Sequence, residues 1–124
     1  MAFTDYVRNL FGRKNAGSLS LVQIVADIGA SGAVTLDVND SSPEVTIVLT
    51  TTGQYTITFP ACQTVALLGA HSLLSEAVGS SIYFETLSAA GTGTFETAVT
   101  TAGATAAEPA SGTRFFITLL CGQN

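Results

Sequence analysis

Short apolar alternations separated by turn signals run through most of this chain and constrain its fold more than any other feature. In the clearest case, Tyr55, Ile57 and Phe59 alternate with threonines and are followed by Pro60. A period of two places alternate side chains on opposite faces of a strand, and proline cannot donate to a central sheet ladder. The pattern therefore predicts a half-buried strand that ends at Pro60.

The same reasoning predicts about eight strands, with turn signals roughly every 8–12 residues. They cover residues 19–28, 34–38, 45–50, 55–59, 64–70, 81–87, 94–100 and 114–121. Residues 71–78 are predicted as a helical turn or loop, and 101–112 as a loop. The fold class is all-β, a jelly-roll-like antiparallel β-sandwich, and 124 residues suffice for one such domain.

Two of the predicted strands are apolar on both faces. In residues 19–28, Leu21 and Val25 share one face while Val22 and Ile24 share the other, and 114–121 repeats this pattern. Strands of an antiparallel sandwich normally keep one face in water. We therefore expect these strands to be covered by contact with another subunit.

The N-terminal segment differs from the rest in periodicity and charge. Its apolar residues recur at the spacing of one helical face, which predicts a short amphipathic helix. Two to three turns are not stable alone in water, so this helix needs a partner surface. It could pack on its own domain, dock on a neighbouring subunit or lie on a membrane. We divide the chain into an arm with a linker, 1–18, and a β-sandwich domain, 19–124.

The partner-binding prediction assumes that the N-terminal helix docks on a neighbouring subunit. The apolar stripe would enter a groove and the cations would orient it. The predicted partner-binding residues are Phe3, Tyr6, Val7, Arg8, Leu10, Phe11, Arg13 and Lys14.

Charge is scarce and unevenly distributed. The three cations and Asp5 of residues 1–14 leave a net charge of +2, whereas Arg114 against eight acids leaves −7 in residues 15–124. An acidic body argues against nucleic acid as a partner. No apolar run is long enough for a membrane span, and the N-terminus does not read as a signal peptide, so we expect no membrane partner and synthesis in the cytoplasm.

The sequence contains no complete catalytic or metal-binding motif. His71, Ser72 and Glu76 supply the residue types of a catalytic triad, but no G-x-S-x-G motif accompanies them, and a polar loop histidine fits better. The loop from Asp37 to Ser42 resembles a calcium loop but lacks its glycine and its glutamate. A turn is the simpler reading, with a loose surface Ca²⁺ site as the alternative. We expect no enzyme activity, no cofactor and no metal.

Two cysteines and one tyrosine leave open questions. Cys62 and Cys121 lack C-x-x-C spacing; two buried thiols are the simple reading, and a disulfide is the alternative. Tyr83 alternates out of phase with Ile82 and Phe84, so it is the one candidate for an exposed sugar platform. Core or interface packing is the competing explanation for this tyrosine.

Three segments carry a resemblance to a known group of proteins. They are Gly53-Gln-Tyr-Thr-Ile-Thr-Phe-Pro60, Thr105-Ala-Ala-Glu-Pro-Ala-Ser-Gly-Thr113 and the Arg-Phe-Phe-Ile-Thr-Leu-Leu of residues 114–120. This Thr/Ala/Gly-rich style resembles small jelly-roll virion proteins of tailed bacteriophages, such as capsid decoration (cement) proteins and head-fibre domains, over roughly residues 45–120.

The resemblance implies a structural virion protein made in the host cytoplasm. It implies a homo-oligomer, with a trimer favoured, that cements the major capsid protein or a neighbouring virion protein through its N-terminal arm. A receptor- or glycan-binding module of a phage fibre or tail is the alternative function.

Overall fold

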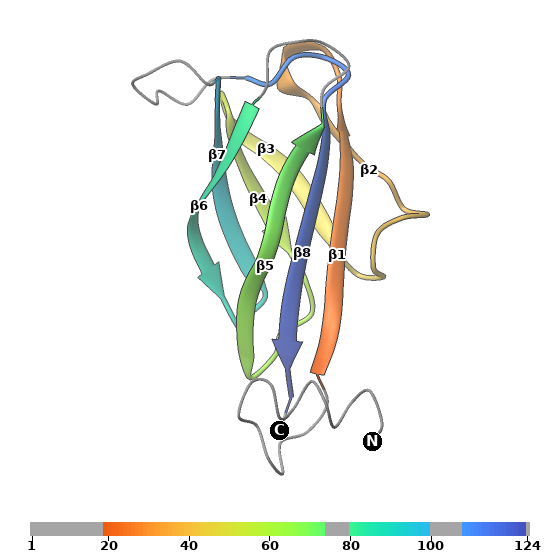
Figure 1. Ribbon diagram of the computed structural model, residues 1–124, viewed down its shortest axis with the longest axis vertical. Helices are drawn as coiled ribbons and strands as arrows, with labels where there is room; N and C mark the ends of the chain where they lie inside the picture. The colour runs from red at the N-terminus through yellow and green to blue at the C-terminus, as the bar shows by residue number, and fades with distance from the viewer. Residues whose placement is uncertain (1–18, 74–79, 100–107, 124) are drawn as a thin grey trace.

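The computed structural model describes residues 19–73, 80–99 and 108–123, and these form a two-layered antiparallel β-sandwich (Figure 1). Eight strands in two sheets confirm the predicted fold class. The strands are β1 (Leu19–Ile28), β2 (Val34–Leu36), β3 (Thr46–Thr51), β4 (Gln54–Thr58), β5 (Thr64–Leu73), β6 (Ser80–Ser88), β7 (Thr92–Val99) and β8 (Arg114–Gly122). A single 3-10 turn, η1 (Ala30–Gly32), joins β1 to β2.

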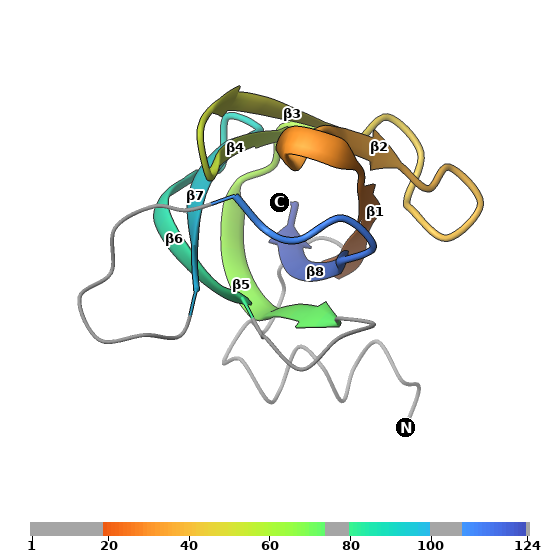
Figure 2. The same cartoon turned by 90° about the horizontal axis from the view of Figure 1, so that it is seen from above.

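The strand order is β2-β1-β8-β5 in one sheet and β3-β4-β7-β6 in the other. Three hairpins, β1–β2, β3–β4 and β6–β7, each stay within one sheet, whereas the connections β2–β3, β4–β5, β5–β6 and β7–β8 pass between sheets. Figure 2, seen from above, shows the two layers facing each other around the core. The strand β8 pairs along its whole length with β1, from Leu19 opposite Gly122 to Asp27 opposite Arg114, and with β5 on its other side.

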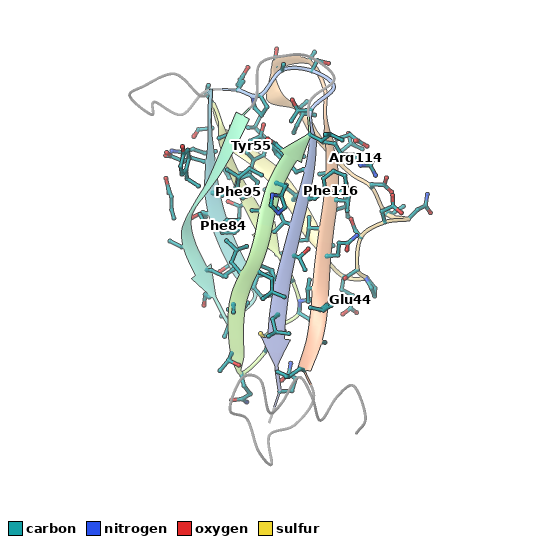
Figure 3. All side chains as sticks on the ribbon, in the orientation of Figure 1. Glu44, Tyr55, Phe84, Phe95, Arg114 and Phe116 are labelled. Carbon is teal, nitrogen blue, oxygen red and sulfur yellow. The ribbon has the colours of Figure 1, made fainter. Side chains whose placement is uncertain are left out.

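The core lies between the sheets and is built from the alternating positions that the sequence predicted. Val22, Ile24 and Ile28 of β1 meet the side chains of β4, β7 and β8. Four aromatic rings form its centre at centroid separations of 5.3–5.6 Å: Tyr55 stacks on Phe95, Phe115 meets both edge-on, and Phe84 tilts against Phe95 (Figure 3). Such offset and edge-on pairs are the favoured geometries for aromatic rings.

The strand β5 is longer than predicted. The prediction ended it at Ala70, but its ladder with β8 continues to Leu73, opposite Arg114. Gly69, Ala70, His71 and Ser72 lack clear alternation, so the signal was weak there. The full length of β8 offers hydrogen-bond partners to these residues, and this tertiary pairing outweighs local propensity. His71 therefore lies in a strand, and the prediction of a loop at this position was wrong.

The predicted arm, 1–18, lies outside the described residues. So do most of the loops predicted at 71–78 and 101–112. The linker and helix of the arm therefore stay predictions, as does the boundary at residue 18.

Candidate interaction surface

The outer side of β1, β8 and β5, which we call the apolar face, combines side chains from all three strands in cross-strand rows. Leu21, Leu120 and Ala66 form one row, and Val25, Phe116 and His71 form another. Strand alternation explains the arrangement, since every second residue lies on the outer face. A row of Gln23, Thr118 and Gly69 lies on the same face between the two apolar rows. The second apolar face that the sequence predicted for β1 and β8 is therefore present in the structure.

Part of this face is covered by the chain itself. Val25 is fully buried although it points away from the core. The loop 37–42 crosses β1 here: Asp37 N–H donates to Val25 O at 2.8 Å, and the Ser41 hydroxyl bonds the N–H and C=O of Val25. The Ser42 N–H donates to Gln23 O, and the Ser42 hydroxyl accepts from Gln23 N–H, each at 2.8 Å. The loop thus also covers the edge of β1 beyond its short pairing with β2, which protects an edge that could otherwise recruit another strand.

Arg114 fixes this loop from the neighbouring strand. Its guanidinium contacts Asp27 at 3.2 Å, Asp40 at 3.0 Å and Asp37, and lies 5.6 Å above the ring of Phe116 (Figure 3). The hydrogen bond from Arg114 is the main reason that the pKa of Asp37 is lowered, followed by the Asp40 N–H. The pKa of Arg114 is raised in turn, chiefly by its hydrogen bond to Asp37. The cluster therefore stays charged at neutral pH and holds the loop across β1.

The rest of the apolar face is open in the described part of the chain. Leu21 is 61% exposed at one end and Leu73 is 62% exposed at the other. Leu68, at the irregularity in the β5–β8 ladder, is also exposed. Large apolar side chains exposed along one face of a small domain can mark a site of association.

The outer side of the second sheet, which we call the hydroxyl face, has the opposite chemistry. One row across its four strands consists of Thr46, Thr58, Thr92 and Ser88. The next row has Val48, Thr56, Thr94 and Thr86. Thr46 bonds Thr58, and Thr86 bonds Thr94 at 2.7 Å. These threonines satisfy their hydroxyls within the sheet and in water, so this face is suited to solvent.

The hydroxyl face also carries the only carboxylate pair described outside the Arg114 cluster. A hydrogen bond that protonated Glu85 donates to the Glu96 carboxylate raises the pKa of Glu85, with burial and the Glu96 charge as smaller causes. Gln54 Nε2 donates to Glu96 Oε1 at 2.6 Å. The hydrogen bond from the Gln54 amide offsets part of the repulsion between Glu85 and Glu96. The described residues place no third potential metal ligand beside this pair.

The structure separates the residues singled out in the sequence. All eight predicted partner-binding residues, from Phe3 to Lys14, lie outside the described residues, as does Glu76. His71 is exposed in β5, opposite Phe116 of β8. Asp37 and Asp40 of the suspected calcium loop bind Arg114, and the described residues contain no group of three potential metal ligands.

Sequence reasoning did not find the Arg114 cluster. One signal was present in the sequence, because Arg114 is the sole Lys or Arg of residues 15–124. Its three aspartate partners are far away in sequence, and the pairing of β1 with β8 brings them close. Tyr83 is 52% exposed on the hydroxyl face, opposite Glu96.

Comparison with models of known protein families, with curated proteins and with solved structures finds no match. Among the described residues, no helix has the length and apolar character needed to cross a membrane. The function is therefore argued from the two outer faces of the sandwich.

Proposed function

We propose that this chain is a structural virion protein, a phage capsid decoration (cement) protein of the type that its sequence resembles. In this proposal it forms a homo-oligomer, a trimer, through its apolar face. The N-terminal arm then docks the oligomer on the major capsid protein or on a neighbouring virion protein.

The observation that carries the proposal is the chemical difference between the two outer faces. Leu21, Leu68 and Leu73 leave apolar surface exposed on one side, whereas the other is mainly threonine, with Val48 and Tyr83 also exposed there. A subunit that associates through one face and meets water with the opposite face requires this asymmetry. Arg114 pairs with Asp27, Asp37 and Asp40, so the charge on this face is confined to one cluster with a formal charge of −2.

The oligomer is tested by placing one negative charge on each face in turn. Leu21→Asp puts a carboxylate into the proposed contact, and Thr92→Asp puts one at an exposed strand position of the hydroxyl face. Sedimentation of the full-length chain at micromolar concentration should show a trimer for the unmodified protein and for Thr92→Asp, and a monomer for Leu21→Asp. Melting curves check that both variants fold. A monomeric unmodified protein, or dissociation caused by Thr92→Asp instead, would refute association through the apolar face.

Docking is tested separately from association. Quantitative mass spectrometry of purified virions from the source that encodes the chain should find it in many copies, and deletion of residues 1–14 should abolish its binding to particles. A low copy number would place the protein in a tail or fibre. A truncated chain that still decorates particles would refute the role of the arm.

A receptor- or glycan-binding module is the second candidate, and the exposure of Tyr83 favours it. A half-exposed aromatic ring beside the Glu96 carboxylate is one element of a sugar platform. Glycan-array hits that disappear in Tyr83→Ala but persist in Thr92→Ala would support this function. A blank array, together with arm-dependent particle binding, would reject it.

A further inference from the structure

The two cysteines meet at the lower end of the sandwich, where the chain passes from one sheet to the other. Cys121 is buried in β8, opposite Val65 of β5 and Ser20 of β1. Cys62 lies in the connection between β4 and β5 and is half-buried. Both side chains pack in the same core cluster although 58 residues of sequence lie between them.

The backbone around Cys62 is held on three sides. Its N–H donates to Ala89 O at 2.8 Å, which ties it to the β6–β7 turn. The next N–H, of Gln63, donates to Gly122 O at 2.8 Å, and Gln123 Nε2 donates to Ala61 O at 3.1 Å. The connection is therefore fixed against the end of β8 that carries Cys121, and the fold holds the two cysteines at the same end of the core.

The two thiols differ in burial. Both cysteines are free, and Cys121 is buried while Cys62 is half-buried. The Cys62 thiol donates to Thr64 O at 3.2 Å. Burial, followed by the hydrogen bond with Cys62, raises the pKa of Cys121. Cys62, the more exposed of the two, is thus the sulfur that a reagent in solution reaches first.

We propose that Cys62 and Cys121 form an intramolecular disulfide when the folded protein meets a small-molecule disulfide such as oxidised glutathione. Cys62, after losing its proton, attacks one sulfur of the oxidant, and one glutathione thiolate leaves. Cys121 then gives up its proton and attacks the Cys62 sulfur of this mixed disulfide, which releases the second glutathione. Two cysteine thiols are oxidised to one disulfide, and one oxidised glutathione is reduced to two molecules of glutathione.

The bond would join the β4–β5 connection to the central strand β8. It would close a loop that contains β5, β6 and β7, and a loop of roughly 60 residues restricts the unfolded chain substantially. We expect the melting temperature of the oxidised protein to exceed that of the reduced protein by roughly 10 °C. This inference concerns the single chain and does not depend on the proposed virion role.

The test uses the full chain, purified reduced and then incubated with oxidised glutathione. Intact-mass spectrometry should show a monomer lighter by two hydrogens, and non-reducing peptide mapping should find Cys62 linked to Cys121. Cys62→Ser should leave Cys121 unmodified, and Cys121→Ala should leave a stable glutathione adduct on Cys62. Neither variant should gain thermal stability on oxidation.

Three results would overturn the proposal. One is a persistent glutathione adduct on the unmodified chain, which would mean that Cys121 cannot reach the mixed disulfide. The others are two thiols that stay free after prolonged oxidation and a disulfide between chains. If either variant fails to fold, the peptide map and melting curves of the unmodified chain still decide the question.

Discussion

At the scale of single residues, Tyr55 shows how a polar atom is accommodated in the core. Its ring is fully buried between Phe95 and Phe115, and its hydroxyl donates to Gly32 O at 2.9 Å. The bond anchors η1 on the core and satisfies a carbonyl that would otherwise be buried without a partner.

Tyr55→Phe keeps the ring and removes this bond. We expect the free energy of unfolding to fall by about 1–2 kcal/mol at pH 7, because the Gly32 carbonyl loses its donor. Denaturant titration measures the loss, with Tyr83→Phe, which removes an exposed hydroxyl, as the control expected to change little. Equal losses in the two variants would contradict the role of the buried bond.

The same tyrosine predicts an alkaline limit to stability. Burial raises the pKa of Tyr55 from 10.0 to about 12, and the Glu108 charge adds to the effect. Between these values the unfolded state releases the phenolic proton while the folded state keeps it, so stability is lost as pH rises through this range. Denaturant titrations from pH 9 to pH 12 should show a steeper decline for the unmodified protein than for Tyr55→Phe. Identical slopes would refute this assignment.

Arg114 predicts a corresponding acid dependence. The folded-state pKa of Asp37 lies below its ordinary value of 3.8, so its contribution to stability is complete above about pH 4 and is lost as pH falls through the folded-state value. Arg114→Gln should lower the melting temperature at pH 7, and the difference from the unmodified protein should shrink towards pH 2.

Thermal unfolding followed by circular dichroism at both pH values measures this effect. Asp27→Asn is the matched control, because the Asp27 side chain is half-exposed and makes the longest of the three contacts. It should cost less than Arg114→Gln. A constant difference between pH 7 and pH 2 would show that the aspartates are not the partners that matter.

At the scale of elements, the β6–β7 turn depends on one glycine. Gly91 has φ +105°, and a Cβ there would lie 2.3 Å from Phe59 O, which belongs to the chain leaving β4. Phe59 N–H donates to Gly91 O at 2.9 Å, so the two segments are held together at this point. Only a residue without a side chain permits so close an approach.

Gly91→Ala should therefore destabilise the protein by about 2–4 kcal/mol, from backbone strain together with the displaced Phe59 carbonyl. Gly29→Ala is the matched control, because Gly29 is extended and the nearest atom to its added Cβ is 3.8 Å away. It should be neutral or slightly stabilising. Urea unfolding of both variants measures the contrast, and a mild effect of Gly91→Ala would mean that the turn can shift.

Much of the element structure was predictable from the sequence, for a physical reason. Where β-branched or aromatic residues alternate with threonine, as from Tyr55 to Phe59, the local pattern and the final burial agree. The extension of β5 through His71 was not predictable, because it depends on the hydrogen bonds of a partner strand. The coverage of Val25 by the loop 37–42 was missed for the same reason: Ser41 and Ser42 act on a strand that is distant in sequence.

At the scale of the whole molecule, the core that the described residues form runs from Val22 to Cys121. We therefore expect deletion of residues 1–14 to leave the melting temperature within a few degrees of the full chain. Thermal unfolding at a fixed concentration provides the measurement, with Phe115→Ala as a positive control that should lose about 3–5 kcal/mol. A large loss on deletion would mean that the arm packs on its own domain.

The candidate site was only partly predictable at this scale. The sequence indicated that β1 and β8 are apolar on both faces, but it could not show that the chain covers one part of the outer face and leaves Leu21 exposed. That division depends on where the loop 37–42 crosses the sheet, which follows from the strand order and the Arg114 contacts.

The central position of β8 has a consequence for how the protein is made. This strand lies between β1 and β5, and Phe115, Ile117 and Leu119 bring a large part of the core. During translation, β1 and β5 wait without their shared neighbour until residues 114–122 have left the ribosome. Folding of the first sheet is therefore completed only after nearly all of this sequence has been synthesised. A messenger truncated before Arg114 would yield a chain with open strand edges, prone to aggregation rather than to partial function.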